Sequence, residues 1–408
     1  MTRMTSGSAS ALARVPVLAA ALAVEFVDEF ADGAKGAAFP LIRHDLALSY
    51  GQIGLLASVP LLLGSLLELP LGVLAGHGRR QRMAVLAGGA VLIASLAAVA
   101  TARSFAALLV AFVVFFPASG AFVGLTQSGL MDADPARQEQ RMARWNLAGS
   151  AGAVAGPVLL IVVLAAGGSW RTAYLVLAGC AAAAWLAVAR SGPRQLAASA
   201  AGRPDDTDRA GGADGAGGAD RAGAVRRVRT ALRQNGVFRW LVLLQLSDLL
   251  LDVLTGFLAI YLVDVVHATP AEAALGVAVR LAAGLAGDVV VVHVLERTAG
   301  LGVLTASAAA AVVLYPGFLL VPGLWPKLAM LAGLSIATAP WYPVLAASLY
   351  GSLPTDSGVA VTLTSAASLA GAAGPLAVGL LAERFGLAWA LAGLVLAPVC
   401  LVMGLRRR

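Results

Sequence analysis

Four carboxylates occur close together in a strongly apolar segment of the 408-residue chain. Glu25, Asp28, Glu29 and Asp32 fall on one face, about 100° wide, if the segment is a helix. An ionised Asp costs about 2.5–3.5 kcal/mol at the centre of a lipid-facing helix, so four cost about 10 kcal/mol. Neighbouring Val, Leu and Phe side chains recover only about 0.3–0.6 kcal/mol each. The face is therefore predicted to line a wet cavity or meet polar partners, where carboxylates bind protons or cations.

A second polar stripe with the same helical spacing lies 220 residues further along the chain. The shift superposes Asp28 on Asp248 and Asp32 on Asp252. Repetition of in-membrane acids at one fixed shift indicates an internal duplication of one half of the chain. The same shift makes three further pairs, namely Glu25 with Gln245, Lys35 with Thr255, and Glu68 with Asp288.

Arg280 lies within a later apolar segment and needs an acidic partner there, for which Asp248 and Asp252 are the candidates. It either neutralises one acid and fixes helix packing, or moves between the acids during a functional cycle. Even with Lys35 counted as a second cation, the in-span acids outnumber the bases. Crowded carboxylates in a low-dielectric site titrate as a coupled group. They can therefore carry protons and attract a cationic ligand that competes for the same site.

The composition explains which elements must position these residues. Of the chain, 59% is hydrophobic and 12% charged, with a mean hydropathy of +0.85, against about half and one-quarter in soluble proteins. The apolar residues form blocks of about 20 or more, the length that crosses a bilayer. Breaks at charges, Pro and Gly leave twelve predicted spans, namely 14–41, 50–76, 82–101, 104–131, 142–166, 170–190, 237–262, 270–295, 300–321, 326–350, 358–382 and 386–404.

The chain is thus predicted to divide into a six-helix half (1–190), a flexible cytoplasmic linker (191–236) rich in Gly, Ala, Asp and Arg, and a second six-helix half (237–408). With both termini on one side, that side holds 22 of the 29 Lys and Arg residues and the other holds five. This asymmetry predicts cytoplasmic termini in the plasma membrane. Arg residues that flank spans interact with headgroups, and no nucleic-acid partner is expected.

The layout resembles the major facilitator superfamily of secondary transporters. The loop "GVLAGHGRR", Gly72–Arg80, is similar to the family's G-x-L-A-D-R-x-G-R-R element, but Gly76 stands at the acidic position and His77 replaces a basic residue. Gly152-x-x-x-Gly156-Pro157 resembles its antiporter motif. "FPLIRHDLALSYGQIGLL", residues 39–56, resembles the fosmidomycin-resistance branch of drug exporters.

The resemblance implies an all-α membrane protein with twelve transmembrane helices in two pseudo-symmetric six-helix bundles. It also implies that the first and seventh spans line a central cavity, with substrate near mid-membrane. Glycine and proline at five positions are expected to bend helices, namely Gly152, Gly156, Pro157, Gly374 and Pro375.

Glu68 and Asp288 precede loops on the predicted cytoplasmic side. We expect them to pair with arginines such as Arg79 and Arg80 as an inner gate. The alternative is a static salt bridge at the membrane edge. Trp145 is interpreted either as an interfacial anchor or as a stacking partner for an aromatic or cationic ligand.

Other chemistry is poorly supported by the sequence. His and Cys residues lack metal-ligand spacing, the Gly-rich linker lacks the Gly-Lys-Ser/Thr ending of a phosphate loop, and no nucleophile is paired with a base. We therefore expect no enzyme activity, cofactor or metal. The chain is also expected to be a monomer.

The hypothesis is a proton-coupled exporter of cationic or amphipathic small molecules. The site residues are Glu25, Asp28, Glu29, Asp32, Gln245, Asp248, Asp252 and Arg280. A proton symporter that imports a polar metabolite, and a receptor on the same fold that does not transport, remain alternatives.

Overall fold

The computed structural model describes residues 6–75, 79–132, 137–190, 236–352 and 371–406. Within these ranges the regular structure is helical, and the all-α prediction is confirmed. Contacts divide the chain into two compact units, one within Met1–Arg203 and Thr269–Ala278, the other within Pro204–Ala268 and Val279–Arg408. The predicted linker, except its last residue, lies outside the described residues.

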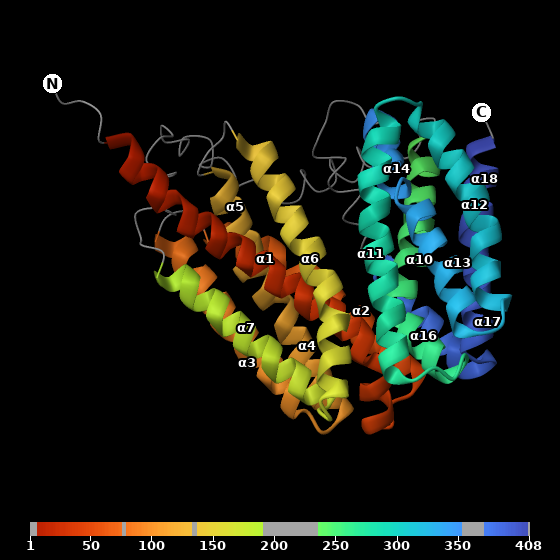
Figure 1. Cartoon of the computed structure of the whole chain (residues 1–408), viewed down its shortest axis with the longest axis horizontal. Coiled ribbons are helices and arrows are strands. Elements are labelled where there is room, and N and C mark those ends of the chain that lie inside the picture. The colour runs from red at the N-terminus through yellow and green to blue at the C-terminus, as the bar shows by residue number, and fades with distance from the viewer. Residues whose placement is uncertain (1–5, 76–78, 133–136, 191–235, 353–370, 407–408) are drawn as a thin grey trace, which may run out of the picture. The chain divides into compact units, whose positions relative to one another are not determined.

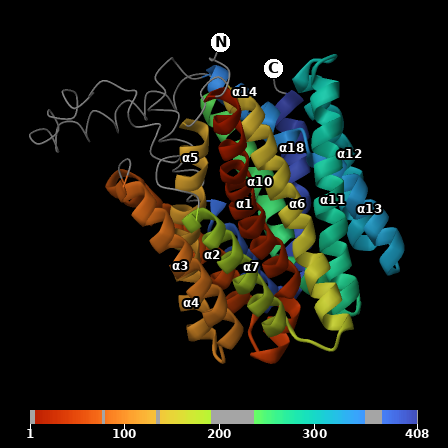
Figure 2. The same ribbon diagram turned by 60° about the vertical axis from the view of Figure 1, so that its left-hand side comes forward.

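Helices of the first unit begin and end close to the predicted spans, although α1 extends well before residue 14. Both views show α1 beside α6 (Figures 1 and 2). The fourth predicted span is divided among α4, a π-helix η1, and α5. The elements are α1 (Ser6–Asp45), α2 (Tyr50–Ala75), α3 (Arg79–Thr101), α4 (Phe105–Ser119), η1 (Gly120–Gly124), α5 (Leu125–Asp132), α6 (Gln138–Ala165) and α7 (Trp170–Arg190).

The helices after the linker also follow their predicted spans, and all but the start of α11 belong to the second unit. The tenth span is interrupted by a turn at Ala339 and Pro340, and part of the eleventh lies outside the described residues. The helix α10 packs against α14, α16 and α18, and α12 packs against α13 and α18. The elements are α10 (Val237–Asp264), α11 (Pro270–Leu295), α12 (Gly300–Leu320), α13 (Leu324–Thr338), α14 (Trp341–Ser352), α16 (Gly374–Phe385), α17 (Leu387–Ala392), η5 (Gly393–Val395) and α18 (Leu396–Arg406).

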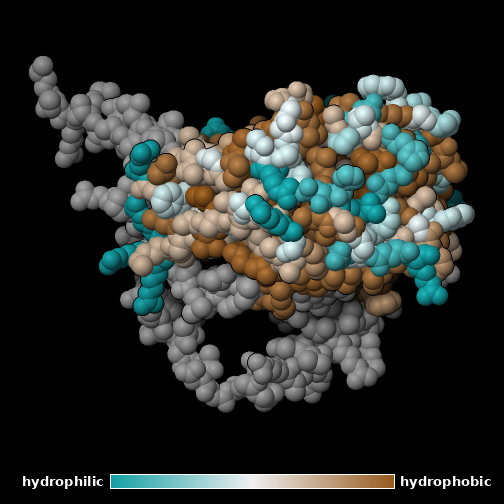
Figure 3. Space-filling view, turned by 90° about the horizontal axis from the view of Figure 1, so that it is seen from below, coloured by the Kyte–Doolittle hydropathy of each residue, from teal (hydrophilic) through white to brown (hydrophobic). Residues whose placement is uncertain are grey.

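The helices are suited to a bilayer. Among the described residues, nine helical stretches are long and apolar enough to cross a membrane. Large apolar side chains on their outer faces are exposed, including Val158 and Val162 of α6 and Val289, Val290 and Val292 of α11. Figure 3 shows one end of the molecule, where hydrophilic residues gather among hydrophobic ones. This distribution is the one expected of helices surrounded by lipid, with polar ends in water.

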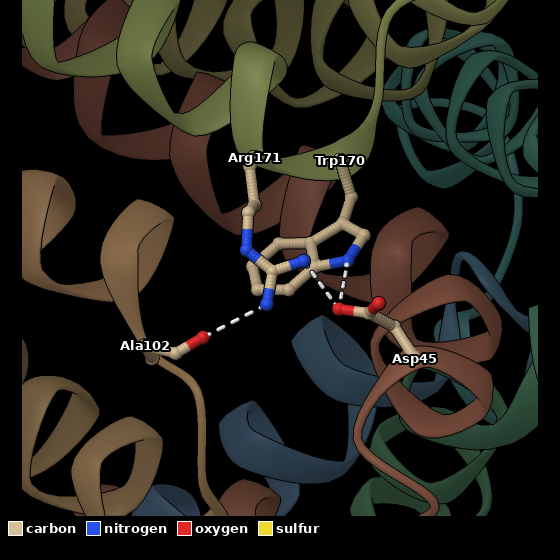
Figure 4. Close-up of polar contacts among 4 residues, drawn as sticks. All are labelled: Asp45, Ala102, Trp170 and Arg171. Carbon is tan, nitrogen blue, oxygen red and sulfur yellow. Dashed lines mark hydrogen bonds and ion pairs between the residues drawn. The ribbon is translucent and has the colours of Figure 1, made fainter.

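A polar cluster, the Asp45 clamp, joins three helix ends of the first unit (Figure 4). Asp45, at the end of α1, accepts hydrogen bonds from the guanidinium of Arg171 and from Trp170 Nε1, the latter at 3.3 Å. Arg171 also donates to the Ala102 carbonyl at 2.9 Å, and its guanidinium carbon lies 4.3 Å from the Trp170 ring centre. The clamp fixes the end of α1 relative to α3 and α7.

The corresponding end of the second unit is fixed by a buried lysine. Lys327 of α13 is only 6% exposed. Its ammonium donates to the Phe318 and Leu319 carbonyls at 2.8 and 2.7 Å and to the Tyr261 hydroxyl at 3.1 Å. Three donors thus meet three acceptors, and the cation lies at the carboxyl end of α12, where the helix dipole is negative.

Candidate functional site

The four carboxylates of α1 form a half-buried stripe that runs along the helix within the first unit. Glu29 interacts electrostatically with the other three carboxylates of the stripe. It also interacts with Lys35, which lies one turn beyond Asp32. Among the described residues, no three His, Cys, Asp or Glu side chains are grouped closely enough to hold a metal ion. The members of the stripe instead make separate polar contacts with α6, α4 and Lys35.

Glu25, at the amino-terminal end of the stripe, contacts α6. Its carboxylate accepts a hydrogen bond from the Trp145 side chain. Trp145 is 2% exposed and packs with Ala21 and Leu130, so it lies in the core and does not act as an interfacial anchor. A Cβ added at Gly149 would lie 2.6 Å from Glu25 Oε1. The glycine lets the Glu25 carboxylate lie directly against α6, and a larger residue would require this side chain to shift.

The same two helices approach closely along the next two turns. A Cβ on Gly152 would lie 2.2 Å from the Phe26 carbonyl oxygen, and one on Gly156 would lie 2.3 Å from the Ala34 nitrogen. On the α1 side, a Cβ on Gly33 would lie 2.2 Å from the Ala153 carbonyl oxygen. Small residues at such spacing let two membrane helices pack backbone to backbone. This contact positions the carboxylate stripe relative to α6.

Asp28, in the middle of the stripe, contacts the fourth predicted span. Ser119 Oγ donates a hydrogen bond to Asp28 Oδ1 at 2.5 Å. Ser119 is the last residue of α4, two residues after Pro117 and immediately before the π-helix η1. Proline removes a helix hydrogen bond, and π-turns within α-helices recur at functional sites. The irregular turn thus begins at the residue that contacts Asp28.

Asp32, at the carboxyl-terminal end of the stripe, forms an ion pair with Lys35. The Lys35 ammonium also lies 4.9 Å from the centre of the Phe116 ring. The hydroxyl of Tyr174 on α7 is buried without a hydrogen-bond partner among the described residues, and it interacts electrostatically with Asp32. If all are ionised, the stripe and Lys35 together carry three more negative than positive charges.

The second unit carries the matching stripe on α10. Asp248 and Asp252 interact electrostatically, and Ser247 Oγ lies 3.4 Å from Asp248 Oδ1. Asp248 is half-buried, whereas Asp252 is exposed. The Gln245 side chain lies next to Gly371, where an added Cβ would be 2.8 Å from Gln245 Oε1. Thr255, the last member of the stripe, donates its hydroxyl to its own helix, at the Leu251 carbonyl.

Arg280 of α11 reaches α10 within the second unit. Its guanidinium donates to the Leu251 carbonyl at 3.0 Å and interacts electrostatically with Asp252. Of the two acids expected as partners, Asp252 is therefore the one beside this cation. A guanidinium has further donors beyond the one used at Leu251. It can hold a carboxylate or another polar ligand group.

The sequence profile of the Major Facilitator Superfamily matches residues 21–247, more than half of the chain, which include the carboxylate stripe of α1 and end just before Asp248. The chain belongs to the Major Facilitator Superfamily. This membership indicates a multi-pass membrane transporter rather than an enzyme. None of the curated proteins compared with the sequence matches it.

Solved structures of superfamily-type transporters share the fold at low sequence identity. A bacterial homologue of the human lysosomal transporter Spinster is 15% identical, with a TM-score of 0.75 and 97% of each chain covered. The nucleoside transporter NupG is 12% identical, with a TM-score of 0.74, covering 95% of this chain and 98% of its own. A POT family transporter in complex with 5-aminolevulinic acid is 14% identical, with a TM-score of 0.72 and coverages of 95% and 94%.

The two arginines that end the motif-like loop after the second span form the start of α3. Arg79 and Arg80, predicted gate residues, are exposed there. The next residues make the contacts instead: Gln81 Nε2 donates to the Leu125 carbonyl at 3.2 Å, and Arg82 donates to the Ala189 carbonyl at 3.0 Å. Arg82 therefore caps the end of α7, a role that the sequence analysis did not assign.

The other predicted gate residues lie on two helices of the superfamily fold. Glu68 is within α2, but its side chain lies outside the described residues. Asp288 is exposed on α11. A gate formed by these residues stays a prediction.

The glycines and prolines expected to bend superfamily helices have varied surroundings. Gly152 and Gly156 lie in the close contact with α1, and Pro157 is inside the continuous helix α6. Gly374 and Pro375 occupy the first turn of α16, directly after a turn, so they begin a helix. Bending during transport stays a prediction for all five.

Proposed function

We propose that this superfamily member is a proton-coupled secondary active transporter that exports cationic or amphipathic small molecules by alternating access. The observation that carries the proposal is the half-buried carboxylate stripe of α1, held by Trp145, Ser119 and Lys35. Trp145 and Ser119 are neutral donors, so among these partners only Lys35 offsets charge, and the ionised stripe carries more negative than positive charges. An excess of this kind attracts protons and cations alike.

Competition supplies the coupling. A cation that binds among ionised carboxylates is displaced when protons neutralise them, and proton release on the other side restores the site. Inward proton movement then drives outward cation movement. The proposed location is the plasma membrane with both termini cytoplasmic, which the Lys and Arg asymmetry favours.

Arg280 supports a second candidate function, a proton-coupled symporter that imports a polar metabolite. A guanidinium beside Asp252 can exchange that carboxylate for an anionic substrate group. In this reading Asp252 takes up a proton as the substrate replaces it. The two functions predict opposite directions of substrate movement under the same pH gradient.

Proteoliposomes with an imposed pH gradient separate these possibilities. Ethidium, a cationic amphipathic fluorophore, serves as the probe, and its movement is followed by fluorescence. The exporter proposal predicts ethidium movement opposite to the proton flow for the wild type. Asp28→Asn and Asp248→Asn should each reduce this movement at least tenfold. Asp264→Asn, a carboxylate at the end of α10, serves as the matched control and should retain it.

Two results would count against the exporter proposal. Full gradient-driven flux in both the Asp28→Asn and Asp248→Asn proteins would remove the carboxylates from the coupling mechanism. Ethidium movement in the same direction as protons would favour the symporter instead.

A further inference from the structure

A cavity of about 300 Å³ lies within the second unit, apart from both acidic stripes. It is formed by the start of α10, the start of α12 and the end of α18, and α18 packs against both of the other helices. Its volume is at the lower limit of typical small-ligand sites, about 300–1,000 Å³. The lining residues are Arg239, Leu301, Gly302, Thr305, Leu405 and Arg406.

The lining is positively charged. Arg239 and Arg406 come from different helices, and the described lining residues include no acid. Thr305 is neutral, and its hydroxyl donates to the Leu301 carbonyl at 2.8 Å. Two guanidinium groups from two helices are a common arrangement for holding a phosphate group.

The amino-terminal end of α12 adds to this charge. Leu301 and Gly302 belong to its first turn, and Ala299 at the N-cap provides no side-chain hydrogen bond. The helix dipole makes such an end positive, and exposed N–H groups there bind anions. A Cβ added at Gly302 would meet nothing within 4 Å, so the first turn opens onto free space.

The cavity also lies at the ends of membrane-spanning helices, where a membrane surface is expected. Arg239 is the third residue of α10 and Arg406 is the last residue of α18, so both lie at helix ends on the side predicted to be cytoplasmic. The Arg239 guanidinium carbon lies 4.6 Å from the centre of the Trp240 ring. Tryptophan and arginine together are typical of the headgroup layer. Anionic lipids are concentrated in the cytoplasmic leaflet, where basic pockets between helices bind their headgroups.

We propose that this cavity binds a phosphate-bearing anion, and that the headgroup of an anionic phospholipid is its source. Both guanidinium groups hold the phosphate, and the first turn of α12 faces it. The site is separate from the carboxylate stripes, so the proposal is independent of the substrate and of the direction of transport.

The test measures thermal stability of the purified full-length protein in detergent. Phosphatidylglycerol is titrated against phosphatidylcholine, and inorganic phosphate is titrated separately. Phosphatidylglycerol is expected to raise the Tm of the wild type more than phosphatidylcholine does. One arginine near a membrane surface contributes about fivefold to affinity, so the half-saturating concentration should rise about fivefold in Arg406→Gln and about 25-fold with Arg239→Gln added.

Arg297→Gln is the matched control, because Arg297 is exposed just after α11 on the same predicted side and does not line the cavity. It should respond as the wild type does. Arg406 is itself exposed, so the single variant remains informative if the double variant does not fold. An arginine-dependent response to inorganic phosphate as well would support the anion site with a soluble source. A response to neither compound, or equal responses of the wild type and both variants, would overturn the proposal.

Discussion

Replacing Gly152 by alanine tests whether the contact between α1 and α6 holds the carboxylate stripe in place. The added Cβ would lie 2.2 Å from the Phe26 carbonyl oxygen, whereas ordinary contacts begin at 3.4 Å, so the helices must separate by about 1 Å. Both atoms are rigidly attached to helices, and no side chain can move aside. Overpacking of this kind costs about 1–3 kcal/mol.

The separation also reaches the polar contacts. Asp28 lies two residues after Phe26, and its hydrogen bond from Ser119 is only 2.5 Å long. A displacement of about 1 Å would weaken it, since hydrogen bonds need donor–acceptor distances near 3 Å or less. Gly152→Ala should therefore lower both the Tm and the rate of ethidium transport.

The matched control is Gly179→Ala on α7, where an added Cβ meets nothing within 4 Å. Alanine is favoured over glycine in a helix by about 1 kcal/mol, so the control should keep or raise the Tm. The two proteins are compared by thermal unfolding in the same detergent. If Gly152→Ala unfolds at the same temperature as Gly179→Ala, the inferred close packing of α1 on α6 is wrong.

Three further predictions concern individual polar contacts. Lys327→Met removes three donors from buried acceptors and should destabilise the protein by about 2–3 kcal/mol, read as a lower Tm; an unchanged Tm would contradict the capping role. Arg171→Gln breaks the ion pair with Asp45, but both side chains are about one-third exposed or more, so we expect a loss of about 1 kcal/mol or less, and a large loss of Tm would refute this. Ser119→Ala should reduce transport while leaving the Tm within a few degrees, because it deletes one contact of Asp28; wild-type flux would show that the contact has no function.

Much of the fold follows from the sequence because bilayer thickness fixes the length of apolar blocks. The seventh and eighth spans, predicted at 237–262 and 270–295, correspond to α10 and α11 almost residue for residue. Charges and turn residues between blocks determine those ends. The start of α1 at Ser6 was missed, since the polar residues before Val15 give no apolar signal.

The site was predictable only in part. Spacing alone placed Glu25, Asp28, Glu29 and Asp32 on one face, since helical periodicity is a local property. Their partners are distant in sequence, and no local pattern marks Ser119 as a donor to Asp28.

Trp145 was expected at an interface or against a ligand, but it is buried beside Glu25. Nothing in the sequence around Lys327 marks its burial at the end of α12. Both depend on tertiary packing. The spacing of Gly152 and Gly156 was a usable signal for close helix packing, in addition to the motif resemblance.

Proton release on cation binding tests the central claim most directly. Purified protein in lightly buffered detergent solution is mixed with ethidium, and a pH indicator follows the protons. If protons and cations compete for the carboxylates of α1 and α10, the wild type releases protons as ethidium binds, and Asp28→Asn releases fewer. Ethidium binding without proton release, or the same release from Asp28→Asn as from the wild type, would contradict the account.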